Sequence, residues 1–221
     1  MKIKDLSRQL VAVYAGRFHP FHIGHAMAFK ELQAKFGAES TYIATSGRVE
    51  PPKSPFSFEE RLVMISAAGI DAGRVFQETV PYAPLMLPQA LKLDPAKDVL
   101  IFGVGSKDMA QDPRFNFAPL KNGTPSYFQP LKGNENNLKP FSNDKSPDGT
   151  RAGHGYVFAV KDYKFNVAGQ IAGSASEIRN RFVAGDADQR QRIVADLYPN
   201  ASPADQARIL KIFESKLGAV K

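Results

Sequence analysis

The amino-acid sequence predicts an α/β fold: a doubly wound, Rossmann-like parallel sheet with helices on both faces and a long insertion before the last strand. Short apolar runs alternate along the chain with segments whose apolar residues recur at the spacing of a helix face. Gly- and Pro-rich turns separate these segments. A repeated strand-then-helix order is typical of parallel sheets, in which ligands bind at the carboxyl ends of the strands.

The first unit is expected to be a strand, a tight turn and a helix. Residues 11–15 form the apolar run Val-Ala-Val-Tyr-Ala, which ends at Gly16. Over residues 25–36, Phe29 and Leu32 recur on one face before a glycine follows. The turn between the two elements therefore lies at the carboxyl end of the first strand.

Three more strands and one helix are predicted before the insertion. The helix should start at Ser57, because Ser57 and Glu60 have the spacing of a capping box. A Pro-rich loop precedes this helix. The strands are expected at residues 41–44, 74–77 and 99–102, the last of which is followed by Gly103.

Between residues 105 and 153 the periodic pattern gives way to Gly, Pro, Asn and Lys. Loops of this length inside a compact domain are usually functional or disordered. The segment also contains aromatic side chains, which disordered tracts usually lack, so we expect an insertion at about 111–155 rather than a plain linker. Its aromatic residues include Phe115, Phe117, Tyr127, Phe128 and Phe141.

The carboxyl-terminal part resumes the regular pattern. A strand is expected at 156–160, and residues 174–177 have the spacing of a second capping box at the start of a helix. A terminal helix is expected over 202–217. We therefore expect one domain over 1–185 that contains the insertion, and a helical tail over 186–221 packed on the same domain.

Composition limits the functional classes. The 221 residues include no cysteine, which removes disulfides, thiolate catalysis and Cys-based zinc sites. No run approaches the roughly 20 apolar residues that cross a bilayer, and the polar start lacks the apolar middle of a signal peptide. We therefore expect a soluble cytoplasmic protein without a membrane partner. The 29 basic and 22 acidic side chains give a net charge of +7, which favours anionic partners, either nucleic acid or phosphate-bearing small molecules.

The residues that carry chemistry lie in the stretch 16–25, Gly-Arg-Phe-His-Pro-Phe-His-Ile-Gly-His. It lies between the first strand and the first helix, where a doubly wound sheet presents a helix amino terminus to a phosphate. His22 and His25 are three residues apart, so both imidazoles can face one polyphosphate, and Gly24 lets backbone or ligand approach closely. Hydrogen-bond donors aimed at a phosphoryl oxygen can catalyse phosphoryl transfer without a protein nucleophile.

This stretch closely resembles the HxGH signature of the nucleotidyltransferase superfamily, which includes nicotinamide mononucleotide, pantetheine phosphate and FMN adenylyltransferases and several cytidylyltransferases. Two further segments agree in order and separation. Residues 51–64 look like the PPxK…(S/T)xxxRLxM stretch of that superfamily, and residues 174–179 are similar to its ISSTxIR motif. The resemblance covers about residues 11–110 and 156–182, and some bacteriophage-encoded members carry a similar insertion.

The resemblance implies a role for each matched residue. His22 and His25 would contact the α- and β-phosphates of a nucleoside triphosphate and stabilise the transition state, with Lys53 and Arg179 as further catalytic cations. The nucleotide-binding residues would be Gly16, Arg17, Phe18, His19, Gly24, Gly103, Ser174, Ala175 and Ser176. The acceptor-binding residues would be Arg61, Tyr82, Asp108 and Phe115.

The implied reaction joins a phosphate-bearing acceptor to a nucleotide. The acceptor phosphate would attack the α-phosphorus of ATP in line and pyrophosphate would leave, with Mg²⁺ carried by the triphosphate rather than by protein ligands. The acceptor that the motifs favour is nicotinamide mononucleotide, so the product would be NAD. Because the chain has no Trp, Phe18, Tyr82 or Phe115 would supply the ring contact with the nicotinamide. The expected partners are ATP or CTP and a phosphorylated small molecule, and nucleic acid is not expected. The sequence leaves open whether the protein forms a homo-oligomer.

Several alternatives remain at this stage. Within the superfamily, the chain could transfer a cytidylyl group or use another phosphorylated acceptor. A non-catalytic nucleotide- or nucleic-acid-binding module is a different class, although a pure binder needs no histidine pair. Class I aminoacyl-tRNA synthetases also contain His-Ile-Gly-His, but this chain shows no KMSKS-like lysine loop. A zinc site on His19, His22 and His25 is disfavoured, because residues six apart on a helix point to different sides.

Plainer structural roles compete with the functional ones at single positions. Lys53 could be a solvated charge, Asp108 a turn residue, Arg61 a structural partner and Ser174 a simple helix cap.

Overall fold

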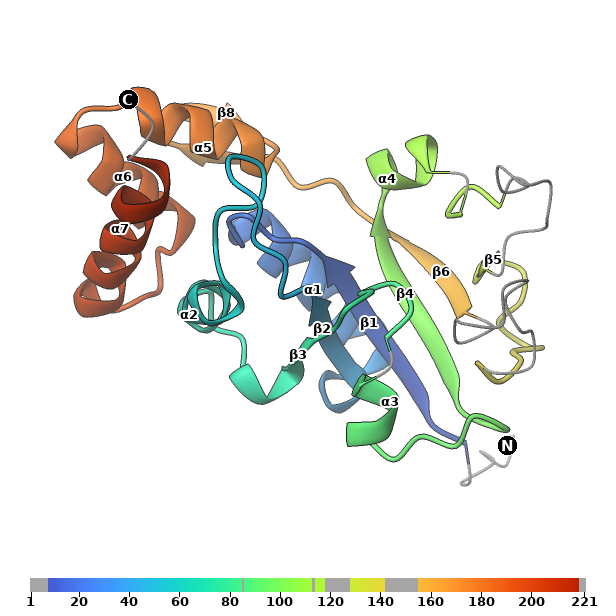
Figure 1. The fold of residues 1–221 in the computed structure, drawn as a ribbon. Coiled ribbons are helices and arrows are strands. Elements are labelled where there is room, and N and C mark those ends of the chain that lie inside the picture. Colours follow the sequence, from blue (N-terminus) through green and yellow to red (C-terminus); the bar gives the residue numbers. More distant parts are fainter. Residues whose placement is uncertain (1–7, 85, 113, 118–127, 142–154, 219–221) are drawn as a thin grey trace.

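The computed structural model of the chain describes residues 8–84, 86–112, 114–117, 128–141 and 155–218. Part of the expected insertion, including Tyr127, lies outside these described residues. Figure 1 shows the sheet at the centre of the molecule with helices packed around it.

A six-stranded parallel sheet in the order β3-β2-β1-β4-β6-β5 forms the centre of the fold, which confirms the predicted doubly wound α/β class. Every neighbouring pair in this sheet is parallel. The predicted strands are present, and β5 adds a short edge strand from within the insertion. The strands are β1 Leu10–Gly16, β2 Thr41–Thr45, β3 Val75–Gln77, β4 Val99–Gly105, β5 Phe128–Pro130 and β6 Gly155–Val160.

The strand order reverses beside β1. From β1 the chain builds outward through β2 and β3, and it then crosses to the other side of β1 to form β4. Tyr14 therefore pairs with Ile43 of β2 on one side and with Gly103 of β4 on the other. Such a switch point leaves a crevice at the carboxyl ends of the two central strands, where open α/β sheets bind ligands.

Helix caps follow the sequence signals, with two differences. Ser57 and Glu60 form the predicted capping box of α2. At α5, Ser174 accepts the Glu177 N–H, but the Glu177 carboxylate accepts the N–H of Gly173 instead of completing the box. The first helix starts at Ile23, two residues before the predicted start. The helices are α1 Ile23–Phe36, α2 Phe58–Ala67, α3 Met86–Ala90, α4 Ser106–Gln111, α5 Ala175–Ala184, α6 Ala187–Leu197 and α7 Pro203–Leu217, with 3-10 turns at Ala38–Ser40 and Ala72–Arg74.

The two faces of the sheet are covered differently. Helix α1 packs closely on one face, where a Cβ at Gly103 would lie 2.4 Å from the Cδ1 of Leu32. The opposite face is covered by Leu87 of the short helix α3 and by aromatic side chains of the insertion. The described part of the insertion thus supplies core, which explains its aromatic content. The buried aromatic residues of the insertion are Phe115, Phe128 and Phe141.

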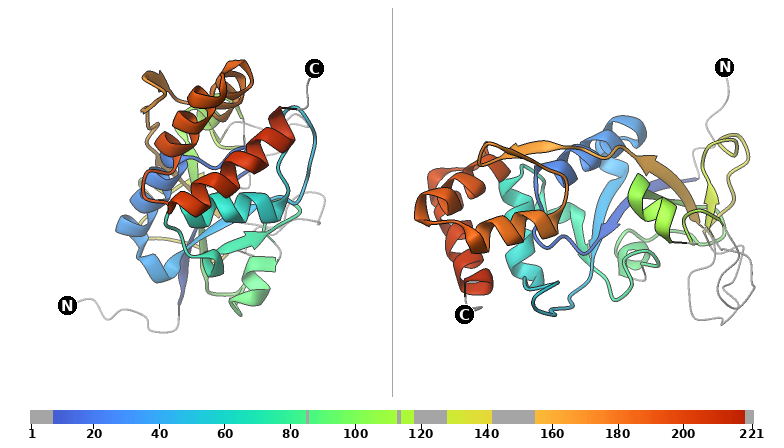
Figure 2. Two further views of the ribbon diagram at one scale, coloured as in Figure 1. Left: turned by 90° about the vertical axis from the view of Figure 1, so that its left-hand side faces the viewer. Right: turned by 90° about the horizontal axis from the view of Figure 1, so that it is seen from above.

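The carboxyl-terminal helices extend the core beyond the sheet. Figure 2 shows α6 and α7 gathered at one end of the molecule. The Phe213 ring of α7 lies 5.2 Å from the rings of both Phe56 and Phe182. A small antiparallel hairpin that the sequence patterns missed, β7 Phe165–Val167 and β8 Gln170–Ala172, connects β6 to α5. Among the described residues, no helix has the length and apolar character needed to span a membrane.

Candidate functional site

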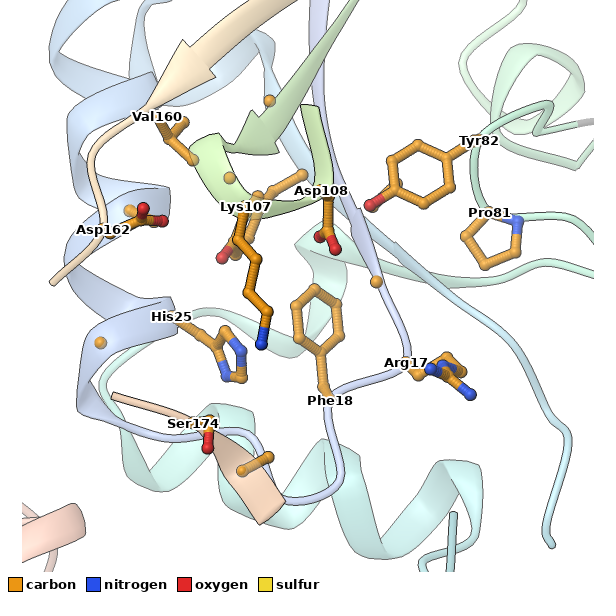
Figure 3. A pocket seen from close by; sticks show the side chains of 18 of the residues that line it. Arg17, Phe18, His25, Pro81, Tyr82, Lys107, Asp108, Val160, Asp162 and Ser174 are labelled. Atoms are coloured by element: carbon orange, nitrogen blue, oxygen red, sulfur yellow. The ribbon is translucent and has the colours of Figure 1, made fainter. Parts of the chain in front are cut away.

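A cavity of about 890 Å³ opens at the carboxyl ends of β1, β4 and β6. Figure 3 shows side chains from these strands, from α1 and α4, and from the start of α5 facing this cavity. Most of the site residues expected from the sequence lie in its wall. These are Gly16, Arg17, Phe18, His22, Gly24, His25, Tyr82, Gly103, Asp108, Phe115, Ser174 and Ala175.

The two signature histidines cap the first helix together. His22 is the N-cap of α1, and its Nδ1 accepts the backbone N–H of His25 (3.4 Å). In return, the Nδ1 of His25 accepts the backbone N–H of His22 (3.3 Å). The two rings stack with their centroids 3.6 Å apart. Because each Nδ1 accepts a hydrogen bond, the neutral form of each ring carries its proton on Nε2, which leaves an N–H donor for a ligand.

Burial keeps both imidazoles uncharged near neutral pH. It lowers the pKa of His22 to about 3, and burial together with the neighbouring His22 places the pKa of His25 well below its ordinary value. His22 is only 4% exposed, so its ring is buried rather than facing solvent. The reason is the hairpin: the Phe165 ring of β7 lies 4.9 Å from the His22 ring and covers it.

Two glycines of the signature stretch make room for aromatic rings. A Cβ at Gly24 would lie 2.8 Å from Phe165 and 3.2 Å from the His22 ring. A Cβ at Gly16 would lie 2.7 Å from the ring of Phe18. Gly24 was expected to admit backbone or ligand, and the close neighbours in the structure are protein side chains instead.

A second helix amino terminus faces the same cavity. Ser174 is the N-cap of α5, and it lines the cavity together with Ala175. Both α1 and α5 therefore point their amino-terminal ends, with unpaired N–H groups and a partial positive charge, toward one space. This arrangement suits a polyphosphate.

Ser176 and Arg179 of α5 lie beside the cavity rather than in its wall. Arg179 donates to Ser176 Oγ (3.2 Å) and to the backbone carbonyl of His19. Burial and the nearby Arg17 lower the pKa of Arg179. The segment therefore brings a second arginine to the loop between β1 and α1, although its guanidinium already has protein partners.

His19 and Lys53 are also outside the cavity wall. The His19 ring is buried, and its Nδ1 accepts the backbone N–H of Phe56 (3.2 Å). Burial, followed by the charges of Arg61, Arg179 and Arg17, lowers the pKa of His19 to about 3. Lys53 is exposed in the turn after β2. Neither residue is brought to the cavity wall with His22 and His25.

Arg61 was expected to contact the acceptor, but the structure buries it completely. Its guanidinium donates to the carbonyl of Arg17 (2.8 Å), to that of Ser57 (3.1 Å), to Thr45 Oγ1 and to the carbonyl of Ser46. Because its donors are used on protein atoms, the expected substrate contact is replaced by a structural role.

The far end of the cavity is aromatic and carries carboxylates. The Tyr82 ring lies 4.6 Å from the Phe115 ring, and the Tyr82 hydroxyl faces Asp108 in Figure 3. Burial, with Asp108 as the next contribution, raises the pKa of Tyr82, and burial raises the pKa of Asp108. This end suits a flat, polar ring better than a phosphate.

Sequence reasoning missed several charged residues of the cavity wall. Lys107 of α4 extends toward His25 in Figure 3, and Asp162 lies just after β6. Arg114, paired with Asp112 (2.6 Å), lies with its guanidinium 5.0 Å from the centre of the Phe115 ring. The signal for Lys107 and Asp162 was available, since both follow the carboxyl end of a predicted strand.

Comparison with known proteins finds related sequences and a related fold. Residues 13–118, just under half of the chain, match the family model described as cytidylyltransferase-like. Over 62 residues the chain is 39% identical to a nicotinamide-nucleotide adenylyltransferase of Methanolobus tindarius, covering 28% of this chain and 36% of that protein. Over 68 residues it is 35% identical to nicotinamide-nucleotide adenylyltransferase 1 of Sulfolobus acidocaldarius, covering 29% of this chain and 39% of that protein. The chain thus spans well under two thirds of these relatives.

A solved structure shares the fold. The bifunctional NMN adenylyltransferase/ADP ribose pyrophosphatase of Francisella tularensis superposes with a TM-score of 0.52 at 19% identity, over 95% of this chain and 52% of that chain. This likeness confirms the Rossmann-like α/β architecture. The sequence matches support the nucleotidyltransferase superfamily to which the signature stretch pointed.

Proposed function

We propose that this protein is a nucleotidyltransferase that joins the nucleoside monophosphate of ATP to a phosphate-bearing acceptor and releases pyrophosphate. One observation carries the proposal. The stacked pair of His22 and His25 at the start of α1 shares a cavity with the amino terminus of α5, which begins after Ser174. A triphosphate between the two helix ends would meet backbone N–H groups from both and the Nε2–H groups of the histidines.

The histidines would act by donating hydrogen bonds to charged phosphoryl oxygens. An oxygen of the acceptor phosphate attacks the α-phosphorus of ATP in line, and a new P–O bond forms. The bond from the α-phosphorus to the bridging oxygen breaks, and pyrophosphate leaves with that electron pair. Neutral imidazoles that donate from Nε2 can stabilise the phosphoryl oxygens throughout. Phosphate binding would also raise the low pKa values of His22 and His25, because an anion favours the charged imidazolium.

Mg²⁺ fits this site as a companion of the triphosphate. Among the described residues, no cluster of three His, Asp or Glu side chains could hold a metal ion. Mg²⁺ commonly keeps several waters and binds substrate phosphates with one or two carboxylates. Asp162 lines the cavity and is the carboxylate that would face its hydration shell. When bound, the ion would neutralise charge on the phosphates.

The acceptor best supported is nicotinamide mononucleotide, which would make the product NAD. The aromatic pair Tyr82 and Phe115 offers a stacking surface, and the Asp108 carboxyl beside it suits a positively charged pyridinium ring. Two of the proteins with matching sequence segments are nicotinamide-nucleotide adenylyltransferases by name.

Pyrophosphate release tests the proposal. Purified protein with Mg²⁺ is offered ATP or CTP in combination with nicotinamide mononucleotide, nicotinic acid mononucleotide, phosphopantetheine or FMN. His25→Asn is the control, because the Asn Oδ1 can replace Nδ1 as the acceptor that caps α1 while the Nε2–H is lost. We expect release with ATP and nicotinamide mononucleotide, reduced about 100- to 1000-fold in the variant. Turnover with a different pair would change the assigned acceptor or nucleotide. No pyrophosphate release with any pair would reject the reaction class.

A further inference from the structure

Arg61 is a buried cation that the proposed chemistry leaves without a role. It lies in α2 with none of its surface exposed, and it is the largest fully buried side chain among the described residues. The ion pairs found in the described part of the chain do not include it. Burial lowers its pKa to about 10, and the nearby carboxylates of Glu59 and Glu60 oppose that shift. A buried guanidinium needs compensating hydrogen bonds, so its partners indicate what it is for.

Arg61 links two loops of the cavity wall through its hydrogen bonds. Nη1 donates to the carbonyl of Arg17, in the loop after β1, and to Thr45 Oγ1 at the end of β2. Nη2 donates to the carbonyl of Ser46. Arg17 and Ser46 line the cavity, whereas Arg61 does not. The guanidinium therefore fixes, from behind, the backbone that faces the cavity.

One of these bonds sets the orientation of a single peptide group. In a trans peptide the C=O and the following N–H point in opposite directions. The carbonyl of Arg17 points inward to Arg61, so the N–H of Phe18 points away from Arg61. No hydrogen bond from this N–H to another described residue is present. Phe18 itself has a φ of 54°, a left-handed conformation that a bulky residue rarely adopts without support.

The same peptide lies next to the signature histidines. The Phe18 ring contacts the His25 ring edge to face, with centroids 5.0 Å apart. On its other side, the ring folds back over Gly16, which must lack a Cβ for that reason. Phe18 and His25 both line the cavity, so a phosphate bound there could accept from both the His25 Nε2–H and the Phe18 N–H.

We propose that Arg61 is a positioning residue: it holds the peptide between Arg17 and Phe18 so that the Phe18 N–H donates to a phosphoryl oxygen of the bound triphosphate. This inference rests on the proposed function for its substrate. An aligned backbone donor stabilises charge on a phosphoryl oxygen only when its direction is fixed in advance. Arg61 fixes it with a rigid planar fork, which lysine lacks.

Selective labelling makes this peptide visible without measuring turnover. The sequence contains three Arg-Phe pairs, which end at Phe18, Phe115 and Phe182. Labelling of Arg with ¹³C at the carbonyl and of Phe with ¹⁵N leaves three coupled amide signals, and Phe182, buried in α5, serves as an internal reference. The probe is Mg²⁺ with a non-hydrolysable ATP analogue. We expect the Phe18 amide proton to move downfield in the wild type and the Phe182 signal to stay in place.

Arg61→Lys is the variant, and Arg190→Lys is its matched control. Arg190 also donates its guanidinium to two backbone carbonyls, those of Phe182 and Val183, and it does not line the cavity. We expect Arg61→Lys to lose the Phe18 shift and Arg190→Lys to keep it. A wild-type Phe18 signal that does not move, or one that moves equally in Arg61→Lys, would overturn the inference.

Kinetics separates positioning from general damage. Arg61→Lys should lower kcat about 10- to 100-fold with little change in the KM for ATP, and it should weaken the preference between the two diastereomers of α-thio ATP. Thr45→Val removes a single partner of Arg61 and should give a smaller effect of the same kind if Arg61→Lys does not fold. Unchanged diastereomer preference in a folded variant would also refute the role. Absence of turnover in the wild type would instead reject the proposed function. The Phe18 amide signals would still test whether Arg61 orients this peptide.

Discussion

At the scale of single residues, the histidine pair combines a structural and a chemical task. Each Nδ1 accepts a backbone N–H at the start of α1, so the ring orientation is set by the helix itself. The Nε2 positions then remain for a ligand. An asparagine can replace the acceptor but not the Nε2–H, so the two tasks can be separated by substitution.

His22→Asn and His22→Ala should therefore differ in stability but not in activity. We expect both variants to lose turnover about 100- to 1000-fold, because both lack the Nε2–H. Only His22→Ala also loses the helix cap, which should lower its free energy of unfolding by about 0.5–2 kcal/mol relative to His22→Asn. Urea unfolding and pyrophosphate release measure the two effects. Full turnover in His22→Asn would show that the imidazole does not touch the phosphate.

The buried histidines also predict a sensitivity to acid. The pKa values of His19 and His22 fall from 6.5 in the unfolded chain to about 3 in the folded protein. Between these values the unfolded state binds more protons, so the free energy of unfolding decreases as the pH falls below 6.5. Each histidine can contribute up to about 1.4 kcal/mol per pH unit.

His19→Asn tests this contribution, since the Asn Oδ1 can still accept the Phe56 N–H. We expect the melting temperature of the variant to fall less between pH 7 and pH 5 than that of the wild type. Equal slopes in the two proteins would mean that His19 takes up its proton equally easily in the folded and unfolded states.

At the scale of elements, the close approach of α1 to the sheet depends on one glycine. A Cβ at Gly103 of β4 would lie 2.4 Å from the Cδ1 of Leu32, and both residues are held by regular structure. Gly103→Ala should therefore destabilise the fold by about 1–3 kcal/mol through overpacking, as measured by urea unfolding. Adding Leu32→Ala should recover part of the loss caused by Gly103→Ala if this contact is its source. Failure of the second change to compensate would place the strain elsewhere.

The elements were the part of the fold most open to prediction. Apolar periodicity located α1 and the main strands, and the cap at Ser57 marked the start of α2. The hairpin β7–β8 was missed because its strands have three residues each, too few for a periodic signal. Within the site, His22 and His25 were singled out by their spacing and by the resemblance of their stretch to the HxGH signature, whereas Lys107 and Asp162 were not singled out.

At the scale of the whole molecule, the carboxyl-terminal helices support the loop between β1 and α1. The Tyr198 hydroxyl, fully buried after α6, donates to the backbone carbonyl of Phe21. Phe213 of α7 packs on Phe56 and Phe182, and Lys216 pairs with Glu60 (3.3 Å). The tail therefore shares a core with the segment that carries the histidines.

A chain that ends at residue 185 should not keep the native fold. Removal of α6 and α7 would expose Phe56 and Phe182, which are fully buried in the complete structure. We expect loss of cooperative unfolding in circular dichroism. Tyr198→Phe is the milder companion: it removes only the hydroxyl and should cost about 0.5–1.5 kcal/mol with the fold intact. A truncated chain that melts like the full one would show that the domain folds without its tail.

The sequence by itself determined the order of the main strands and of α1, α2, α5 and α7, the capping box at Ser57, and the stretch that places two histidines at a helix start. These features are local: a capping box spans four residues, and periodicity is read within one element. Only the tertiary structure decided that Phe165 buries His22, that Arg61 lies buried behind the cavity wall, and that insertion aromatics cover the second face of the sheet. Each of these depends on contacts between residues far apart in the chain, and local patterns carry no record of which distant partner will meet a side chain.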